Sequence, residues 1–132
     1  MKRPYSPPKL TKYESMSDLP EHLREELEGK LFVVFNRDRT YLLVSDAFAQ
    51  MLGYDARELV GKRVDDITPQ NVVNIELAFR ALLEMEEMGG LWLLKHRTGR
   101  NLLVRYHAHR GPDFLYADIE PVRFENESVD AA

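Results

Sequence analysis

The sequence AFAQMLGY at residues 47–54 leads directly into DARELVGK at residues 55–62, and DITP follows at residues 66–69. Gly53 and Gly61 each stand where a short helix would end. Glycine is favoured at such a position because it takes a left-handed backbone conformation without steric cost. The stretch therefore predicts two short helices in succession, each closed by a glycine.

Polar residues in the same stretch predict where these helices begin. Ser45 precedes the first helix as an N-cap, and Asp55 with Glu58 has the spacing of a capping box. Thr68 followed by Pro69 indicates the N-cap and first residue of a third helix. We expect that helix to be the longest, over residues 69–88, with Phe79, Leu82 and Leu83 on its apolar face and Gly89-Gly90 at its end.

Strand patterns lie on both sides of the helical stretch. The runs LFVVF at 31–35 and YLLV at 41–44 flank a polar turn and predict a hairpin. Neither run alternates between apolar and polar residues, so both faces of this hairpin should be covered. After the long helix, residues 90–97, 100–110 and 114–121 predict a three-strand meander with turns at Thr98-Gly99 and Gly111-Pro112.

Tight turns would give the meander a definite register. Leu91 would then face Tyr106 and Leu93 would face Val104, while on the next pair Tyr106 would face Ala117 and Ala108 would face Leu115. This register gives one apolar face, with the Tyr106 hydroxyl as its exception. The opposite face would carry Trp92, Leu94 and Leu103, with Arg105 beside Asp118 and His107 beside Tyr116.

The motif run and the order of elements resemble the PAS domain family, over residues 31–122. The matching segments are AFAQMLGY, ELVGK and DITP, which are similar to that family's recurring run. The resemblance implies a mixed α/β (α+β) fold, with a five-stranded antiparallel sheet and short helices and one long helix on one face. We expect a disordered tail at residues 1–14, an N-terminal helix within 15–29, the PAS-like domain at 30–122 and a flexible tail at 123–132.

Residues 19–28 predict an amphipathic helix with a leucine stripe at Leu19, Leu23 and Leu27. Such a stripe must be buried, either on the chain's own sheet or against a second protein. PAS domains commonly pair through this region, so the resemblance favours a homodimer. The candidate dimer interface comprises Leu19, Leu23, Leu27, Trp92, Phe114 and Tyr116.

In the PAS arrangement the long helix and the inner face of the sheet enclose a cavity. Ala108 and Ala117 are small and could leave room there, and Tyr106 could supply a directional hydrogen bond. Alternatively, Phe79 and Met51 fill that room, because protein interiors tolerate few voids. The candidate ligand-binding residues are Met51, Phe79, Leu83, Tyr106, Ala108 and Ala117.

Composition excludes several classes of function. The net charge is −4 and charges of both signs are interspersed, which argues against a nucleic-acid partner. No apolar run is long enough to span a membrane and no signal peptide opens the chain, so we expect a cytoplasmic protein. The chain has no cysteine, so disulfides and cysteine-ligated metals are excluded.

The sequence shows no catalytic constellation, and we expect no enzymatic activity. Ser45 lacks the glycine-framed elbow of a nucleophilic serine. His107 and His109 share a strand face and could bind a metal with Asp118, but two histidines make a weak signal and we expect no metal. The resemblance adds further exclusions. Without cysteine there is no flavin adduct or covalent chromophore, and without a histidine in 69–88 the usual haem ligand is missing.

The expected function is a PAS-type sensory and signal-transduction module. It would bind a small apolar ligand in its core and signal through dimerisation to an effector protein. The alternative is a ligand-free interaction or dimerisation module that regulates a separate effector. The nature of the ligand stays open in both readings.

Overall fold

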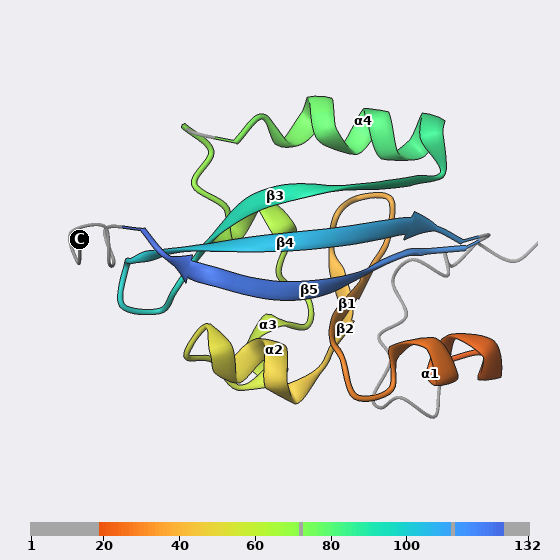
Figure 1. Ribbon diagram of the computed structural model, residues 1–132, viewed down its shortest axis with the longest axis horizontal. Helices are drawn as coiled ribbons and strands as arrows, with labels where there is room; N and C mark the ends of the chain where they lie inside the picture. Colours follow the sequence, from red (N-terminus) through yellow and green to blue (C-terminus); the bar gives the residue numbers. More distant parts are fainter. Residues whose placement is uncertain (1–18, 72, 112, 126–132) are drawn as a thin grey trace, which may run out of the picture.

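The computed structural model describes residues 19–71, 73–111 and 113–125. Its centre is a five-stranded antiparallel sheet in the order β2-β1-β5-β4-β3, as Figure 1 shows. This confirms the predicted α+β fold. The helices are α1 (Glu21–Leu27), α2 (Asp46–Met51), α3 (Ala56–Leu59), the 3-10 helix η3 (Val64–Ile67) and α4 (Ile75–Met85). The strands are β1 (Leu31–Phe35), β2 (Tyr41–Val44), β3 (Glu87–Lys95), β4 (Asn101–Arg110) and β5 (Leu115–Phe124).

The predicted caps of the first two short helices are present. The Ser45 hydroxyl accepts hydrogen bonds from the N–H groups of Phe48, at 3.2 Å, and of Phe32, at 3.1 Å, so it joins the start of α2 to β1. Asp55 and Glu58 form the expected capping box at α3. Gly53 closes α2 with φ of 86°. Local sequence therefore decides these two helices, as the motif predicted.

The long helix is shorter than predicted, and both of its expected ends are wrong. It begins at Asn74, whose side chain accepts a hydrogen bond from the N–H of Leu77 at 3.0 Å. It ends at Glu86, which takes the left-handed conformation with φ of 71°. Thr68 is not the N-cap of α4 but the C-cap of η3. Its hydroxyl donates to the carbonyl of Val64 at 2.8 Å.

Gly89 and Gly90 lie inside β3 instead of terminating α4. The reason is their neighbour on β4. A Cβ on Gly90 would lie 3.5 Å from the Tyr106 ring, and a Cβ on Gly89 would lie 3.2 Å from the Tyr106 carbonyl oxygen. The contact at Gly89 would be tight and the one at Gly90 ordinary, so the close approach of β4 favours glycine at position 89, which helix-end statistics do not reveal.

The register of β3 against β4 differs by one residue from the predicted one. His96 donates its N–H to the carbonyl of Arg100 at 2.7 Å, so the loop holds three residues and not two, with Gly99 at φ of 98°. Trp92 consequently faces Val104, and Gly90 faces Tyr106. A slip of one residue exchanges the two faces of a strand, so Trp92 lies on the inner face.

The register of β4 against β5 differs by two residues, which leaves the faces unchanged. The N–H of Gly111 donates to the carbonyl of Phe114 at 2.8 Å. As a result Tyr106 pairs with Ile119, and Ala108 pairs with Ala117. The predicted inner face of these two strands is therefore correct, although its cross-strand pairs are not.

Two apolar clusters cover the two faces of the sheet. The larger one lies on the inner face, between the sheet and helices α2, α3 and α4, and it includes Phe48, Leu82 and Val104. The smaller one joins the leucines of α1 to the outer face of β1 and β2, and β5 begins beside it. None of the helices in the described ranges combines the length and apolar character needed to cross a bilayer.

Candidate ligand-binding cavity

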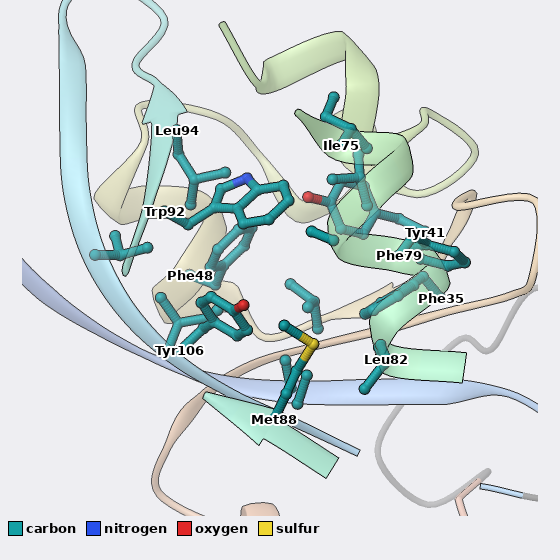
Figure 2. A pocket seen from close by; sticks show the side chains of 17 residues that line it. Phe35, Tyr41, Phe48, Ile75, Phe79, Leu82, Met88, Trp92, Leu94 and Tyr106 are labelled. Carbon is teal, nitrogen blue, oxygen red and sulfur yellow. The ribbon is translucent and has the colours of Figure 1, made fainter. Parts of the chain in front are cut away.

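An internal cavity of about 80 Å³ lies between α4 and the inner face of the sheet (Figure 2). Strands β1 and β2 contribute Val33, Phe35 and Tyr41 to its lining, and η3 contributes Val64. Apolar side chains make almost all of its surface. The lining residues are Val33, Phe35, Tyr41, Phe48, Val64, Ile75, Ala78, Phe79, Leu82, Met88, Trp92, Leu94, Val104, Tyr106, Ala108, Ala117 and Ile119.

Two tyrosine hydroxyls are the polar groups that reach the cavity. Figure 2 shows the oxygens of Tyr41 and Tyr106 turned toward its interior from different walls. Burial raises the pKa of both phenols, most strongly that of the fully buried Tyr41. Both groups are therefore neutral at physiological pH and can donate or accept a hydrogen bond.

Trp92 lines the cavity, and a hydrogen bond from its indole nitrogen holds the ring in place. Its Nε1–H donates to the hydroxyl of Thr68 at 3.1 Å, and that hydroxyl in turn donates to Val64. The indole also meets the Tyr106 ring edge to face, with centroids 5.7 Å apart and an interplanar angle of 85°. Trp92 is the only tryptophan in the chain, so its fluorescence reports on this cavity.

An ion pair lies beside the cavity, next to the ring of Phe79. Arg39 donates two hydrogen bonds to the carboxylate of Asp65, at 2.8 and 3.0 Å, and its guanidinium lies 5.3 Å from the centre of the Phe79 ring. The hydrogen bonds from Arg39 hold the pKa of Asp65 below its usual range. Each charge satisfies the other, so neither offers a free partner to an ionic ligand in the cavity.

Four of the six predicted ligand-binding residues line this cavity: Phe79, Tyr106, Ala108 and Ala117. The other two do not. Met51 lies at the end of α2 and packs against the core, and Leu83 is turned away from the lining by its place on α4. That these residues bind a ligand stays a prediction.

Sequence reasoning missed Trp92, Tyr41 and Met88 as parts of the cavity wall. Trp92 was placed on the outer face by the wrong loop length, and the same error affected Leu94, which is buried in the inner core. Tyr41 gave no signal, because every residue of β2 is buried and no alternation marks its inner face. Met88 was assigned to the long helix, whereas it belongs to β3.

Four of the six residues proposed for a dimer interface are buried within the chain, and the other two are partly exposed. Leu19, Leu23 and Leu27 are buried against Phe32, Val34, Leu42, Leu43 and Phe114. Phe114 is itself buried in this cluster, Tyr116 packs at its edge, and Trp92 lies on the opposite face. The leucine stripe therefore packs on the chain's own sheet, which is one of the two alternatives for its burial, and the homodimer interface stays a prediction.

His107 and His109 share the outer face of β4 as predicted, and Asp118 is the direct cross-strand partner of His107, but Asp118 is not part of the group whose ligand atoms converge. Its carboxylate pairs with the ammonium of Lys30 at 3.5 Å. The carboxylate that reaches the histidines belongs to Glu87 on β3, whose Oε2 lies 2.5 Å from His107 Nε2. Sequence reasoning missed Glu87 because it placed residues 69–88 in a helix.

Comparison with known proteins agrees with the fold. Residues 26–113 match the family described as PAS fold. A PAS domain of an HTR-like protein from Haloarcula marismortui superimposes with a TM-score of 0.63 at 22% identity, covering 77% of this chain and 92% of that one. No curated protein sequence matches the chain.

Two of the similar structures are complexes with a small molecule. One is the PAS domain of a LuxR-family transcriptional regulator from Burkholderia thailandensis in complex with ethanol, with a TM-score of 0.63, 11% identity, and coverage of 79% of this chain and 98% of that one. The other is the RpfR quorum-sensing receptor PAS domain of Cronobacter turicensis in complex with BDSF, with a TM-score of 0.61, 14% identity, and coverage of 70% and 93%. These likenesses concern the fold. Because the family match spans most of the sequence, the chain belongs to the PAS family and is a sensory and signalling domain.

Proposed function

We propose that this PAS domain senses a small, neutral and mainly apolar molecule that binds in the internal cavity. The observation that carries this proposal is the cavity's composition: apolar walls with two inward hydroxyls, at Tyr41 and Tyr106. Apolar walls favour a ligand that buries hydrocarbon surface, and a hydroxyl fixes its orientation through one hydrogen bond. No charged side chain lines the space, so an ionised ligand would lose its hydration without compensation.

The volume limits the size of the ligand. A dry cavity of about 150 Å³ accommodates benzene, and the cavity here is about 80 Å³. A molecule of a few non-hydrogen atoms therefore fits without rearrangement, such as a short alcohol, aldehyde or ketone. The PAS domain crystallised with ethanol supports this class of ligand. A longer chain would require Met88 or α4 to move.

Binding would reach an effector through α4. This helix forms one wall of the cavity with Phe79 and Leu82, and its other face carries the exposed side chains of Leu77 and Met85. A ligand that shifts α4 would alter this exposed apolar surface, and a partner protein could then bind to it with a different affinity. A ligand changes the equilibrium between two positions of α4 only if it binds one of them more tightly.

Native mass spectrometry beside denaturing mass spectrometry would show whether a small molecule is carried through purification. Trp92 fluorescence would then follow titration with ethanol, 1-propanol and 1-butanol. We expect saturable changes, with the affinity of Tyr106→Phe reduced about five- to tenfold because one hydrogen bond contributes about 1 kcal/mol. A linear response that does not saturate, and that is the same in Tyr106→Phe, would contradict the proposal.

The alternative function, a ligand-free interaction module, is supported by four exposed apolar side chains: Leu77, Met85, Leu91 and Val122. Light scattering across a concentration series would test self-association. If the mass doubles while no alcohol saturates the fluorescence, the alternative is favoured over sensing. Scattered apolar residues are common on protein surfaces, so the cavity carries more weight than they do.

A further inference from the structure

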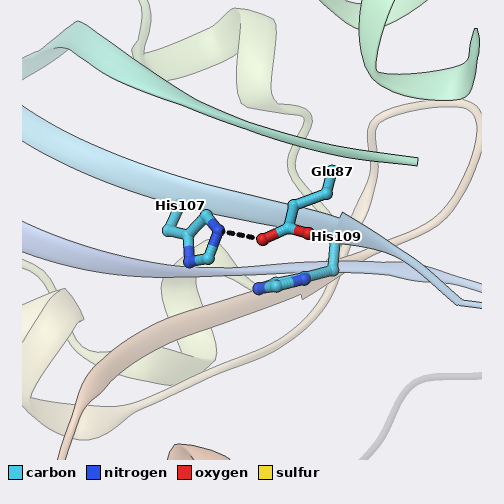
Figure 3. A group of neighbouring side chains, drawn as sticks. All are labelled: Glu87, His107 and His109. Atoms are coloured by element: carbon cyan, nitrogen blue, oxygen red, sulfur yellow. Dashed lines mark hydrogen bonds and ion pairs between the residues drawn. The ribbon is translucent and has the colours of Figure 1, made fainter. Parts of the chain in front are cut away.

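Three side chains with metal-binding atoms converge on the outer face of the sheet, on the side away from the cavity. They are Glu87 on β3 and His107 and His109 on β4, and one ligand atom from each lies within 4.8 Å of the others (Figure 3). Among the residues that the structure describes, they are the group whose donor atoms could hold an ion. We propose that Glu87, His107 and His109 form a binding site for a divalent transition-metal ion such as Zn²⁺.

Strand pairing places the three residues together. Glu87 is the direct partner of His109 in the β3–β4 register. His107 lies two positions earlier on β4 and so points to the same face. The two imidazole rings are 4.3 Å apart between centroids. The site therefore depends on backbone pairing in the sheet and not on the conformation of a loop.

The side chains next to the site already restrain it. His109 stacks on Tyr116 with centroids 4.9 Å apart and an angle of 16°, which fixes the plane of its ring. The contact of 2.5 Å between Glu87 and His107 holds a carboxylate and an imidazole at bonding distance. The stacking reduces the entropy that His109 loses when an ion binds, while Glu87 and His107 remain exposed.

The donor set suits a transition metal. Imidazole nitrogen binds zinc, cobalt and nickel, and a carboxylate completes sets of two histidines and one acid. Ligand atoms around zinc lie about 2.0–2.2 Å from the ion, which puts neighbouring ligand atoms about 3.3–3.6 Å apart in a tetrahedral site. Separations here reach up to 4.8 Å and the Glu87–His107 contact is 2.5 Å, so the side chains must move by about an ångström when an ion binds. Glu87 and His107 can make that adjustment because their side chains are 58% and 48% exposed.

A fourth group approaches from α1. The Nε2 atom of His109 is buried without a hydrogen-bond partner in the described part of the chain, and Glu26 Oε2 lies 3.8 Å from it. Glu26 is therefore the residue placed to complete a tetrahedral site or to bind the metal's water. An ion held by β3, β4 and Glu26 would fasten α1 to the sheet, so metal occupancy would control how firmly this helix is attached.

Isothermal titration with Zn²⁺ at about pH 7.5 tests the proposal. We expect one equivalent to bind with micromolar or tighter affinity and the melting temperature to rise with added zinc. The double variant His107→Ala/His109→Ala should lose at least a hundredfold in affinity. His22→Ala is the matched control, because His22 is an exposed histidine on α1 outside the cluster, and it should bind as the parent does.

Circular dichroism of each variant without zinc separates a lost ligand from a lost fold. Equal zinc affinity in the parent and a folded double variant would overturn the site, as would no binding by the parent at 100-fold molar excess. For the fourth position, Glu26→Gln should weaken binding about tenfold. Unchanged affinity in that variant would overturn the link to α1.

Discussion

The two halves of the sheet use their side chains in different ways. In β1 and β2 almost every residue is buried, because the inner core covers one face and α1 covers the other. In β3 and β4 the inner face lines a cavity, while the outer face exposes Leu91, Arg105 and His107. One half therefore supports the fold on both faces, and the other half has a cavity on its inner face and an exposed outer face.

The largest expected effect comes from a glutamate introduced into the buried cluster on the β1–β2 half, compared with a glutamate on the exposed face of β3. Leu23→Glu puts a carboxylate into the cluster between α1 and the β1–β2 face, where Leu23 is 2% exposed. Truncation of a buried leucine alone costs about 2–5 kcal/mol, and a buried charge adds to this cost. We expect the loss to approach the whole stability of a small domain. Circular dichroism in a urea titration measures it.

Leu91→Glu on β3 is the matched control, because Leu91 is 58% exposed, and it should change the stability little. The pair also tests the leucine stripe as a dimer seam. If Leu23→Glu remained as stable as Leu91→Glu and only halved the mass of the protein, α1 would be packing on a second chain and not on its own sheet.

The next prediction concerns the cavity itself. Ala117→Leu extends a side chain into space that is now empty, between Val33 and Ala108, each of which pairs with Ala117 in the sheet. Saturable binding of 1-butanol should be lost, while the free energy of unfolding changes by no more than about 1–3 kcal/mol. Trp92 fluorescence measures binding and urea denaturation measures stability. Ala47→Leu, at an exposed position of α2, should alter neither, and retained butanol binding in Ala117→Leu would place the ligand elsewhere.

The two halves of the sheet also differed in how well the sequence predicted them. The short helices and the β1–β2 hairpin depend on caps, glycines and unbroken apolar runs, which are local signals, and they were predicted with nearly correct bounds. Trp92 was misplaced because one extra loop residue before Arg100 exchanges the faces of β3. Gly89 was misread because the close approach that favours it is to the Tyr106 backbone, on a neighbouring strand. Which residues form the candidate sites depends on contacts between strands, and a single sequence does not show those contacts.

A smaller effect is expected from the ion pair beside the cavity. Asp65→Asn removes the partner of Arg39, and both side chains are mostly buried, at 15% and 16% exposed. A hydrogen-bonded charge pair of this kind contributes about 1–2 kcal/mol after allowance for solvent screening. Urea denaturation at neutral pH should show that loss.

The same pair sets a pH dependence. The folded pKa of Asp65 lies below its usual value, mainly because of the hydrogen bonds from Arg39. The stabilisation is therefore complete above the unfolded pKa of about 3.9 and disappears as the pH falls through the lower folded pKa. The stability difference between the parent and Asp65→Asn should be constant from about pH 5 to 7 and should shrink below about pH 4. A difference that grew in acid would show that Asp65 is not held ionised by Arg39.

An effect of about the same size as that of Asp65→Asn tests the connection between α1 and β1. Gly29 has φ of 79°, and a Cβ built on it would have no neighbour within 4 Å. Gly29→Ala therefore changes backbone strain without a clash and should cost about 1–2 kcal/mol. Gly29→Asn is the control, because asparagine takes the left-handed conformation more readily and should recover part of the loss. Amide hydrogen exchange gives the location of the effect. If α1 is held by its leucines, exchange of the amides in Glu21–Leu27 should accelerate in Gly29→Ala together with those of β1. If only the amides of α1 exchange faster, the helix unfolds independently of the sheet. The domain then does not need the apolar contacts between α1 and the outer face of β1 and β2 in order to fold.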